Sequence, residues 1–253
     1  MTESAAHAPA PARPASTVVV LREPFEVLMV KRNDKVAFMA GAYVFPGGRV
    51  DEGDRAPGTG SREPFDSAQG RPGTGNRPSR FADLNPLEDA AYRRAAVREL
   101  MEEANVRLEP GDLEPFAHWV TPEIEIRRYD TRFFLARMPE QQEARHDDSE
   151  TTAFAWLSPK EAIDKCLAGE VLLPPPTWTT LKQLAAFATV DDAFAWAQSK
   201  SIPRVMPGFF KDDSVTMLTL PGDPLLPTIA GWEVPEETRF LLEDDGIWRA
   251  VKP

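Results

Sequence analysis

Three glutamates near the middle of the chain have the spacing of a metal-binding group. Glu99, Glu102 and Glu103 stand at positions i, i+3 and i+4, so on an α-helix their carboxylates project from one face. Like charges at this spacing repel by about 0.2–0.5 kcal/mol per pair, and near a helix C-terminus the macrodipole also disfavours anions. A hard divalent cation reverses both penalties, because Mg²⁺ prefers carboxylate oxygens and shares its coordination shell with substrate phosphates. The spacing therefore favours a magnesium site, although a solvated acidic helix face accounts for the same residues.

The residues around these glutamates predict an amphipathic helix. Asn85 is suited to be its N-cap and Pro86 its first residue. Asn105 tolerates the left-handed conformation that ends many helices. The arc opposite the carboxylates is apolar and can pack on a core; it consists of Val97, Leu100, Met101 and Ala104.

A glycine-rich turn precedes this helix, in the stretch V-F-P-G-G-R-V-D-E-G-D of residues 44–54. A short strand predicted over residues 42–45 is halted by Pro46 and two glycines. Glycine at Gly47 and Gly48 lets the backbone approach a ligand closely.

The turn and the helix together resemble the Nudix box, G-x5-E-x7-R-E-U-x-E-E-x-G-U, in which U is an apolar residue. Gly48 and Asp54 match its opening, with Asp in place of Glu, and residues 98–106 match its close. Two features depart from the box: 43 residues (55–97) stand where it has seven, and Asn105 replaces its last glycine. Closing so long a loop costs only about 0.6 kcal/mol per doubling of length, so the two halves can still meet.

The resemblance implies a Nudix fold of the α/β (α+β) class, a mixed β-sheet sandwiched between helices, with a C-terminal extension. It implies hydrolysis of a diphosphate with Mg²⁺ or Mn²⁺ as cofactor, and it assigns Arg98 to orienting a carboxylate. Either Glu99 or Glu150 would be the catalytic base, although Glu150 also fits a solvated acidic turn. The metal ligands that the resemblance implies are the carbonyl of Gly47 and the carboxylates of Glu99, Glu102 and Glu103.

Four short motifs narrow the resemblance: W-V-T-P-E, R-R-Y-D-T-R-F-F, L-L-P-P-P-T and L-P-G-D-P. They are similar to a branch of the superfamily that has a long insertion in the box and includes the peroxisomal coenzyme A diphosphatase. This branch implies cleavage of a nucleoside diphosphate linked to another moiety, with coenzyme A or acyl-coenzyme A as the leading candidate. The alternatives are an ADP-ribose- or NADH-type dinucleotide pyrophosphatase, a non-catalytic Nudix-like nucleotide sensor, and a structural protein with a fortuitous acidic helix.

Four arginines are candidates for binding the substrate phosphates. Arg32 ends a predicted strand, and Arg127, Arg128 and Arg132 lie beside another. A guanidinium can donate two parallel hydrogen bonds to a phosphate. Such arginines are as often on the surface or paired with acids, so the sequence leaves both interpretations open.

The remaining pattern indicates a single domain over residues 17–253. Residues 1–16 are rich in Ala and Pro and predict a disordered tail, and the Gly-, Pro-, Ser- and Arg-rich segment at about 55–85 predicts a disordered insertion. Short apolar runs from residue 205 to residue 251 indicate added strands. Strands are also predicted at 17–21, 25–30, 116–120, in a run that ends at 136, and at 154–157, and helices from 159, at about 178–187 and at 190–200.

Composition argues against several other classes of protein. The net charge of −11 gives no general attraction to nucleic acid or to an anionic membrane, so the expected partner is a small-molecule nucleotide. The single cysteine, Cys166, excludes an internal disulfide and a cysteine-based zinc site. No apolar run reaches about 18 residues, and neither a signal-peptide core nor an S-K-L-type address is evident, so we expect a cytoplasmic protein. Homodimers are common among Nudix proteins, but no sequence feature identifies an interface.

Overall fold

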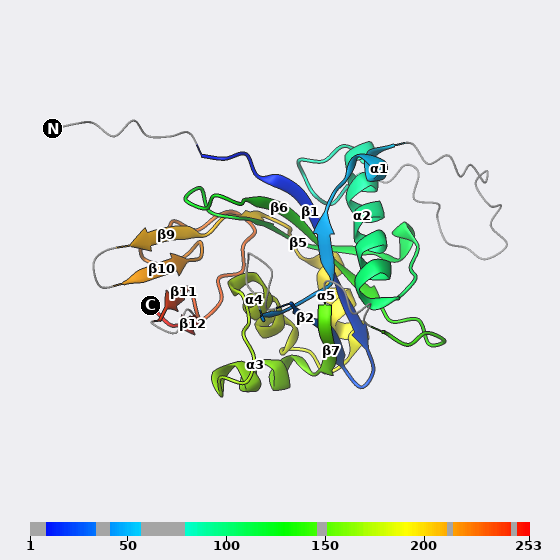
Figure 1. Cartoon of the computed structure of the whole chain (residues 1–253). Coiled ribbons are helices and arrows are strands. Elements are labelled where there is room, and N and C mark those ends of the chain that lie inside the picture. Colours follow the sequence, from blue (N-terminus) through cyan, green and yellow to red (C-terminus); the bar gives the residue numbers. More distant parts are fainter. Residues whose placement is uncertain (1–8, 34–40, 57–78, 146–150, 212–214, 244–246) are drawn as a thin grey trace.

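The computed structural model describes residues 9–33, 41–56, 79–145, 151–211, 215–243 and 247–253. A large mixed β-sheet lies between helices, and a smaller sheet is added by the C-terminal part of the chain (Figure 1). Up to residue 137 the elements are β1 (Arg13–Arg22), β2 (Glu26–Arg32), β3 (Tyr43–Val44), β4 (Gly47–Arg49), α1 (Glu52–Arg55), α2 (Pro86–Ala104), the short 3₁₀ helix η2 (Pro110–Asp112), β5 (Glu114–Val120) and β6 (Tyr129–Arg137). They are followed by β7 (Thr151–Leu157), α3 (Pro159–Leu167), α4 (Pro175–Leu184), α5 (Val190–Ser199), β8 (Arg204–Val205), β9 (Gly208–Lys211), β10 (Thr216–Thr219), β11 (Arg239–Leu242) and β12 (Trp248–Val251).

Strand β1 is the centre of the large sheet, whose strand order is β3-β2-β1-β6-β5-β8. β4 also pairs with β1, and β7 pairs with β2. The β1–β6 and β5–β8 pairs are parallel, and the other pairs of this sheet are antiparallel. This arrangement confirms the predicted mixed sheet.

The sequence of β1 explains why it lies inside the molecule. Val18 and Val20 point to one face of the sheet, Val19 and Leu21 point to the other, and all four are fully buried. The strand begins at Arg13, which contradicts the C-terminal end of the tail predicted for residues 1–16. Residues 13–16 are extended because β6 pairs with one edge of this segment and β4 with the other, contacts that local composition does not encode.

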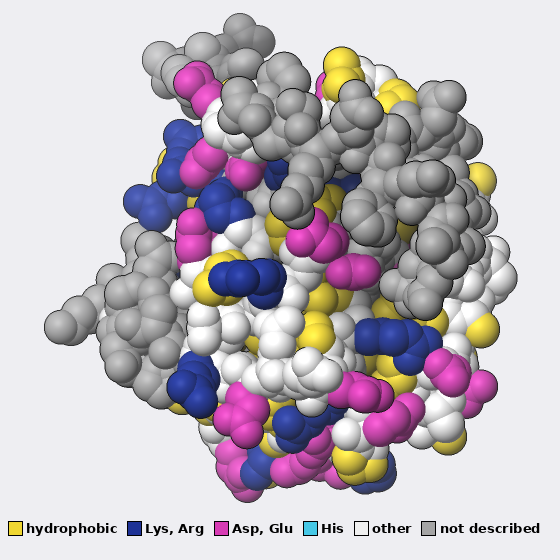
Figure 2. All heavy atoms as spheres, turned by 90° about the vertical axis from the view of Figure 1, so that its right-hand side faces the viewer, with side chains coloured by type: hydrophobic (Ala, Val, Ile, Leu, Met, Phe, Trp, Pro, Cys, Tyr) yellow, Lys and Arg dark blue, Asp and Glu magenta, His cyan; other side chains and the backbone are white. Residues whose placement is uncertain are grey.

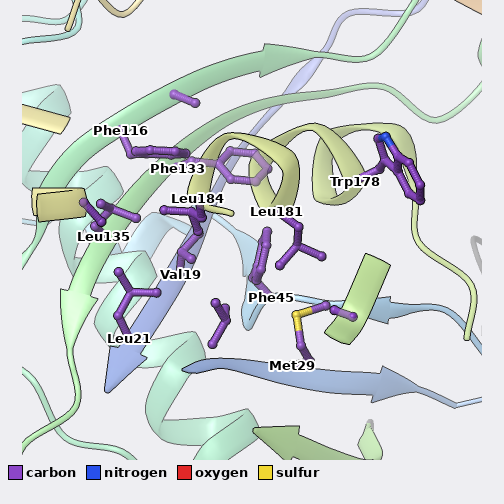
Figure 3. Packing of buried hydrophobic residues seen from close by; sticks show 14 of the residues in the cluster. Val19, Leu21, Met29, Phe45, Phe116, Phe133, Leu135, Trp178, Leu181 and Leu184 are labelled. Atoms are coloured by element: carbon purple, nitrogen blue, oxygen red, sulfur yellow. The ribbon is translucent and has the colours of Figure 1, made fainter. Parts of the chain in front are cut away.

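Two hydrophobic cores lie on the two faces of the sheet. On one face, Trp178, Leu181 and Leu184 of α4 pack against apolar residues of β1, β2 and β6 (Figure 3). On the other face, α2 is buried largely through small residues: Ala91, Ala95, Ala96 and Ala104, with Tyr92 and Leu100. These short side chains allow the helix axis to approach the strands closely, which brings its glutamates near the backbone of the sheet.

The ends of α2 agree with the prediction. The side chain of Asn85 accepts hydrogen bonds from the backbone N–H groups of Leu87 and Glu88, each at 3.0 Å, and Pro86 is the first helical residue. Asn105 closes the helix in the left-handed conformation, with φ of 53°. The predicted apolar arc was wrong at Met101, which is 37% exposed. Successive residues of a helix are about 100° apart, so Met101 turns away from the sheet when Leu100 faces it.

The segment just before α2 is packed rather than disordered, as far as the structure describes it. Phe81 is fully buried and makes edge-on ring contacts with Phe134 and His118. Arg80 donates hydrogen bonds to Glu114 and, at 2.7 Å, to the carbonyl of Lys200. The prediction of disorder up to residue 85 was therefore wrong for residues 79–85, because a single aromatic and a single arginine suffice to dock the segment. The prediction was also wrong for residues 55 and 56, because Arg55 ends helix α1 and Ala56 caps it; the rest of the predicted insertion, residues 57–78, lies outside the described residues.

The C-terminal half follows the predicted order of elements. Ser158 caps α3 by accepting a hydrogen bond from the N–H of Glu161, and Pro159 is its first residue. Helix α4 starts at Pro175, earlier than predicted, because proline fits the first turn of a helix. Strands β9 to β12 form the added antiparallel sheet. No helix in the described ranges is long and apolar enough to cross a membrane.

Candidate metal and diphosphate site

The glycine turn and the acidic helix meet in space. The backbone N–H of Gly47 in β4 donates a 2.9 Å hydrogen bond to the carboxylate of Glu103 in α2, 56 residues further along the chain. The backbone of Gly48 lies directly against the carboxylate of Glu99. The long stretch between the two halves of the motif therefore does not prevent them from forming one site.

Both glycines are required by close approach rather than by an unusual backbone conformation. A Cβ at Gly47 would lie 2.3 Å from the carbonyl oxygen of Ser16, since β4 and β1 pair at this point. A Cβ at Gly48 would lie 2.3–2.5 Å from the carboxylate atoms of Glu99. Real Cβ atoms do not approach other atoms this closely, so the space beside Glu99 exists only because residue 48 has no side chain.

Arg98 connects the two halves through its guanidinium. One terminal nitrogen donates to Glu99 at 2.8 Å and to Glu102 at 3.0 Å. The other donates to Asp54 at 3.0 Å and to the carbonyl of Arg49 at 2.9 Å. The guanidinium holds two donor nitrogens apart in a rigid plane and so reaches acceptors on both halves of the motif, whereas a lysine offers a single nitrogen. The hydrogen bond with Asp54 is the main reason that the pKa of Arg98 is raised above its usual value.

Asp54 is a buried carboxylate at the beginning of the site. Its side chain is 7% exposed, and besides Arg98 it accepts a 2.9 Å hydrogen bond from the backbone N–H of Asp51, which caps α1. Arg94 donates a 2.6 Å hydrogen bond to the carbonyl of Asp54. Arg94 was not identified from the sequence, although it precedes Arg98 by one helical turn and therefore lies on the same face.

The three glutamates differ in exposure. The side chain of Glu99 is 13% exposed, whereas that of Glu102 is 57% exposed. Glu99 thus lies on the inner side of the cluster, against β4, and Glu102 on the outer side.

The donors present suit a hard divalent cation. Carboxylates from α2 and a carbonyl from the glycine turn are oxygen ligands, the type that Mg²⁺ and Mn²⁺ prefer. In the part of the chain that the structure describes, no three acidic, His or Cys side chains already converge as a complete ligand group. Glu99 and Glu102 share Arg98 instead, and Glu103 accepts the Gly47 N–H. The chemistry of the donors and the cleared space at Gly48 fit the cation.

The face beside α1 and α2 carries charges of both signs. Figure 2 views the molecule from the right-hand side of Figure 1 and shows acidic and basic side chains interspersed over the described surface, with apolar ones between them. Attraction of a phosphate to this face must therefore come from individual cations rather than from a broad basic surface.

Two of the four arginines considered for substrate binding are inside the protein. Arg132 is 1% exposed and contacts the carboxylates of Asp83, at 2.6 Å, and Asp130. Arg128 is 7% exposed and donates to the carbonyls of Ala10 and Thr121. Neither guanidinium is directed to solvent, so the structure separates both from the carboxylate cluster and gives them internal partners.

The other two arginines and the alternative base have different surroundings. Arg127 is exposed, in the loop between β5 and β6. Arg32 lies at the end of β2, bonded through its backbone to Gly41 and Ala42, and its side-chain Nε has no hydrogen-bond partner among the described residues. Glu150 lies outside the described residues.

Comparison with known proteins finds similar sequences and a similar fold. A family model described as the NUDT19 Nudix domain matches residues 111–184, which follow the acidic helix. The chain is 28% identical over 276 residues to the Homo sapiens acyl-coenzyme A diphosphatase NUDT19, with 80% of this chain and 72% of that protein covered. The Xenopus laevis protein of the same name is 26% identical over 281 residues, with the same coverage.

Two further relatives extend the similarity. The putative nudix hydrolase 7 of Caenorhabditis elegans is 30% identical over 182 residues, covering 68% of this chain and 59% of that protein. Among solved structures, a NUDIX hydrolase from Alicyclobacillus acidocaldarius superimposes with a TM-score of 0.59 at 24% identity, over 77% of this chain and 99% of that one. This superposition supports the fold described above.

Proposed function

We propose that this chain, a Nudix hydrolase, is a divalent-metal-dependent diphosphatase that cleaves coenzyme A or its acyl esters. The observation that carries the proposal is the meeting of Gly47 and Gly48 with Glu103 and Glu99. The relatives named acyl-coenzyme A diphosphatase align over 80% of the chain, and their substrate is the reason for choosing this one.

The proposed ligands have distinct tasks. When bound, the cation would neutralise charge on the diphosphate oxygens and lower the pKa of the attacking water. Glu99, Glu102 and Glu103 would hold it, together with the carbonyl of Gly47. Arg98 would fix the carboxylates of Glu99 and Glu102 while it remains paired with Asp54, so it orients ligands instead of touching the substrate.

The proposed reaction breaks one P–O bond of the diphosphate and forms another to water oxygen. With coenzyme A as substrate, the products are 3′,5′-ADP and phosphopantetheine. The proton of the attacking water goes to a carboxylate, and Glu99 and Glu150 remain the two candidates. We favour Glu99 as the base among the described residues, because it is the inner carboxylate of the cluster and lies against the glycine turn.

Arg32 is our candidate for contact with the substrate phosphates. It lies on the strand next to β3, whose chain leads into the glycine turn, and its Nε is a donor without a partner among the described residues. Because Nε itself is buried, a phosphate would accept charge-assisted hydrogen bonds from the terminal nitrogens of this half-buried guanidinium. We do not extend this role to Arg132 or Arg128, since both have internal partners.

The proposal is tested by measuring hydrolysis of coenzyme A, acetyl-coenzyme A, ADP-ribose, NADH and ATP with Mg²⁺ or Mn²⁺, with products resolved by mass. We expect 3′,5′-ADP from coenzyme A and the corresponding acyl-phosphopantetheine from its ester. Glu103→Gln should abolish turnover with little change in melting temperature. Glu140→Gln, which removes the same charge from an exposed position between β6 and β7, is the matched control and should behave as wild type.

Other outcomes separate the alternatives. Cleavage of ADP-ribose or NADH in preference to coenzyme A would retain the metal site and reject the substrate. Stabilisation by a nucleotide without any cleavage would favour a sensor. Full activity of Glu103→Gln would contradict the assignment of the site.

A further inference from the structure

A row of residues crosses four strands of the large sheet beneath α2. Residues that pair directly across neighbouring strands point to the same face. Ser16 of β1 pairs with Gly48 of β4 on one side and with Arg132 of β6 on the other, and Arg132 pairs in turn with His118 of β5. Gly48, Ser16, Arg132 and His118 therefore form one line, and Gly48 at its end is the residue that contacts Glu99.

One strip of α2 lies over this row. Tyr92, Ala96, Glu99 and Glu103 are separated by four, three and four residues, so they share a side of the helix. Glu99 rests on Gly48, while the ring of Tyr92 lies 5.0 Å from the guanidinium carbon of Arg132. The hydroxyl of Ser16, which is 1% exposed, donates a 2.7 Å hydrogen bond to the carbonyl of Tyr92. The same row thus supports both the first half of the helix and its acidic end.

Arg132 is the charged member of the row and has partners on two segments of chain. Its guanidinium binds Asp130 on its own strand and, at 2.6 Å, Asp83 on the segment that enters α2. The ring of Phe81, from the same segment, lies 5.4 Å from it. Burial raises the pKa of Tyr92 to about 12, so the neighbouring phenol stays neutral beside this cation.

We propose that Arg132 is a positioning residue, which fixes the start of α2 to the sheet and thereby sets where Glu99 and Glu103 stand relative to Gly47 and Gly48. Being 1% exposed, it acts through these residues and does not touch the substrate. Breaking a buried ion pair leaves an uncompensated charge, which disturbs its surroundings more than loss of a surface pair does. The consequence for turnover rests on the proposed function, but the consequence for the geometry does not.

The test uses two variants and one control in the full chain. Arg132→Lys keeps the charge but cannot serve Asp83 and Asp130 with separate nitrogens. Asp83→Asn removes the partner whose side chain is 50% exposed, and so perturbs the contact with less risk to folding. Arg137→Lys is the control, since Arg137 ends the same strand, is half exposed and pairs with the exposed Asp191.

Three readouts are needed. The first is hydrogen exchange of the Gly47 amide without metal, because this N–H is bound to Glu103. The second is the affinity for Mn²⁺ alone, measured by electron paramagnetic resonance. The third is the separation of kcat from KM at low and at saturating metal. Removing residues that orient metal ligands typically costs 10–100-fold in affinity, and we expect about tenfold for Arg132→Lys and about threefold for Asp83→Asn.

We expect faster exchange at Gly47 in both variants, a lower kcat at an unchanged KM, and recovery of kcat at saturating metal. Wild-type exchange and Mn²⁺ affinity in both folded variants would overturn the proposal. If Arg132→Lys does not fold, Asp83→Asn alone decides. Failure to cleave coenzyme A would reject the proposed function and leave the exchange and Mn²⁺ results to judge the role of Arg132 separately.

Discussion

Replacing Gly48 by alanine tests the central contact of the site. The added Cβ would lie 2.3 Å from the Glu99 carboxylate carbon and 2.4 and 2.5 Å from its oxygens. Ordinary contact begins near 3.4 Å, so the carboxylate must move by 3.4 − 2.3 = 1.1 Å or more. The backbone at Gly48 has no positive φ, so alanine meets no conformational obstacle.

The expected effect is large on turnover and small on stability. Misplacing a reacting or binding group by about 1 Å can cost about 100-fold in rate, equivalent to about 2.7 kcal/mol in the barrier. Glycine-to-alanine changes at compatible positions contribute only about 0.4–1 kcal/mol, in the stabilising direction, through the unfolded state. We therefore expect kcat for coenzyme A to fall by about 100-fold while the melting temperature stays within a few degrees of wild type.

Two neighbouring glycines provide matched controls in the same motif. A Cβ at Gly53 would meet nothing within 4 Å, so Gly53→Ala should retain wild-type kcat and melting temperature. A Cβ at Gly47 would collide with the backbone of Ser16 and Thr17, which cannot rotate away, so Gly47→Ala should destabilise the fold itself. Steady-state kinetics and thermal melts on the three variants separate site geometry from folding. Wild-type kcat in Gly48→Ala, or the same loss in Gly53→Ala, would refute the reasoning.

Three further changes probe other parts of the chain. Arg98→Lys should lower kcat by about 10–100-fold with little change in KM, because one ammonium cannot replace the fork; a rise in KM alone would contradict the orienting role. Asn85→Ala should remove about 1 kcal/mol of capping and lower the melting temperature by about 2–4 °C with kcat unchanged, because the contacts of Ser16 and Arg132 still hold the helix on the sheet; a tenfold loss of kcat would show that the cap itself positions the helix. Asp130→Asn tests a pH effect: burial raises the pKa of Asp130, but the hydrogen bond from His118 and the charge of Arg132 outweigh burial and hold that pKa below its usual value. A depressed carboxyl pKa stabilises the fold fully above the unfolded value of about 3.9, and this stabilisation is lost as the pH falls through the lower folded-state pKa, so the melting temperatures of variant and wild type should differ at pH 7 and converge only as the pH falls from about 4 through that lower pKa.

Local signals in the sequence were sufficient to predict where α2 begins and ends. The side chain of Asn85, the proline after it and the left-handed Asn105 set both ends of the helix, and each acts on its own few residues. The alternation of β1 likewise follows from a strand buried on both faces, because successive side chains point in opposite directions. These features need no knowledge of distant parts of the chain.

Contacts between segments that are distant in the chain could not be predicted from such local signals. Arg132 precedes Phe134 by two residues on a strand, so both side chains point to the same face of the sheet. Since Phe134 is an apolar residue expected in the core, this spacing could have predicted that Arg132 is buried. Its partner Asp83 is 49 residues away, and nothing in the sequence joins the two. Strand β4 was missed for the same reason, since Gly47 and Gly48 have low strand propensity and are extended only because they pair with β1.

The attachment at both ends of the interrupted motif has a consequence for engineering. Asp54 bonds to α2 before the interruption, and Arg80, Phe81 and Asp83 contact the sheet after it. With both ends held, lengthening the chain between them costs only about 0.6 kcal/mol per doubling. A guest domain with adjacent termini, such as a fluorescent reporter, could be spliced between residues 57 and 78 without altering the contacts of Glu99 and Glu103. The protein would then carry a tag close to the helix that we propose to bind its metal, with both ends of the chain left unmodified.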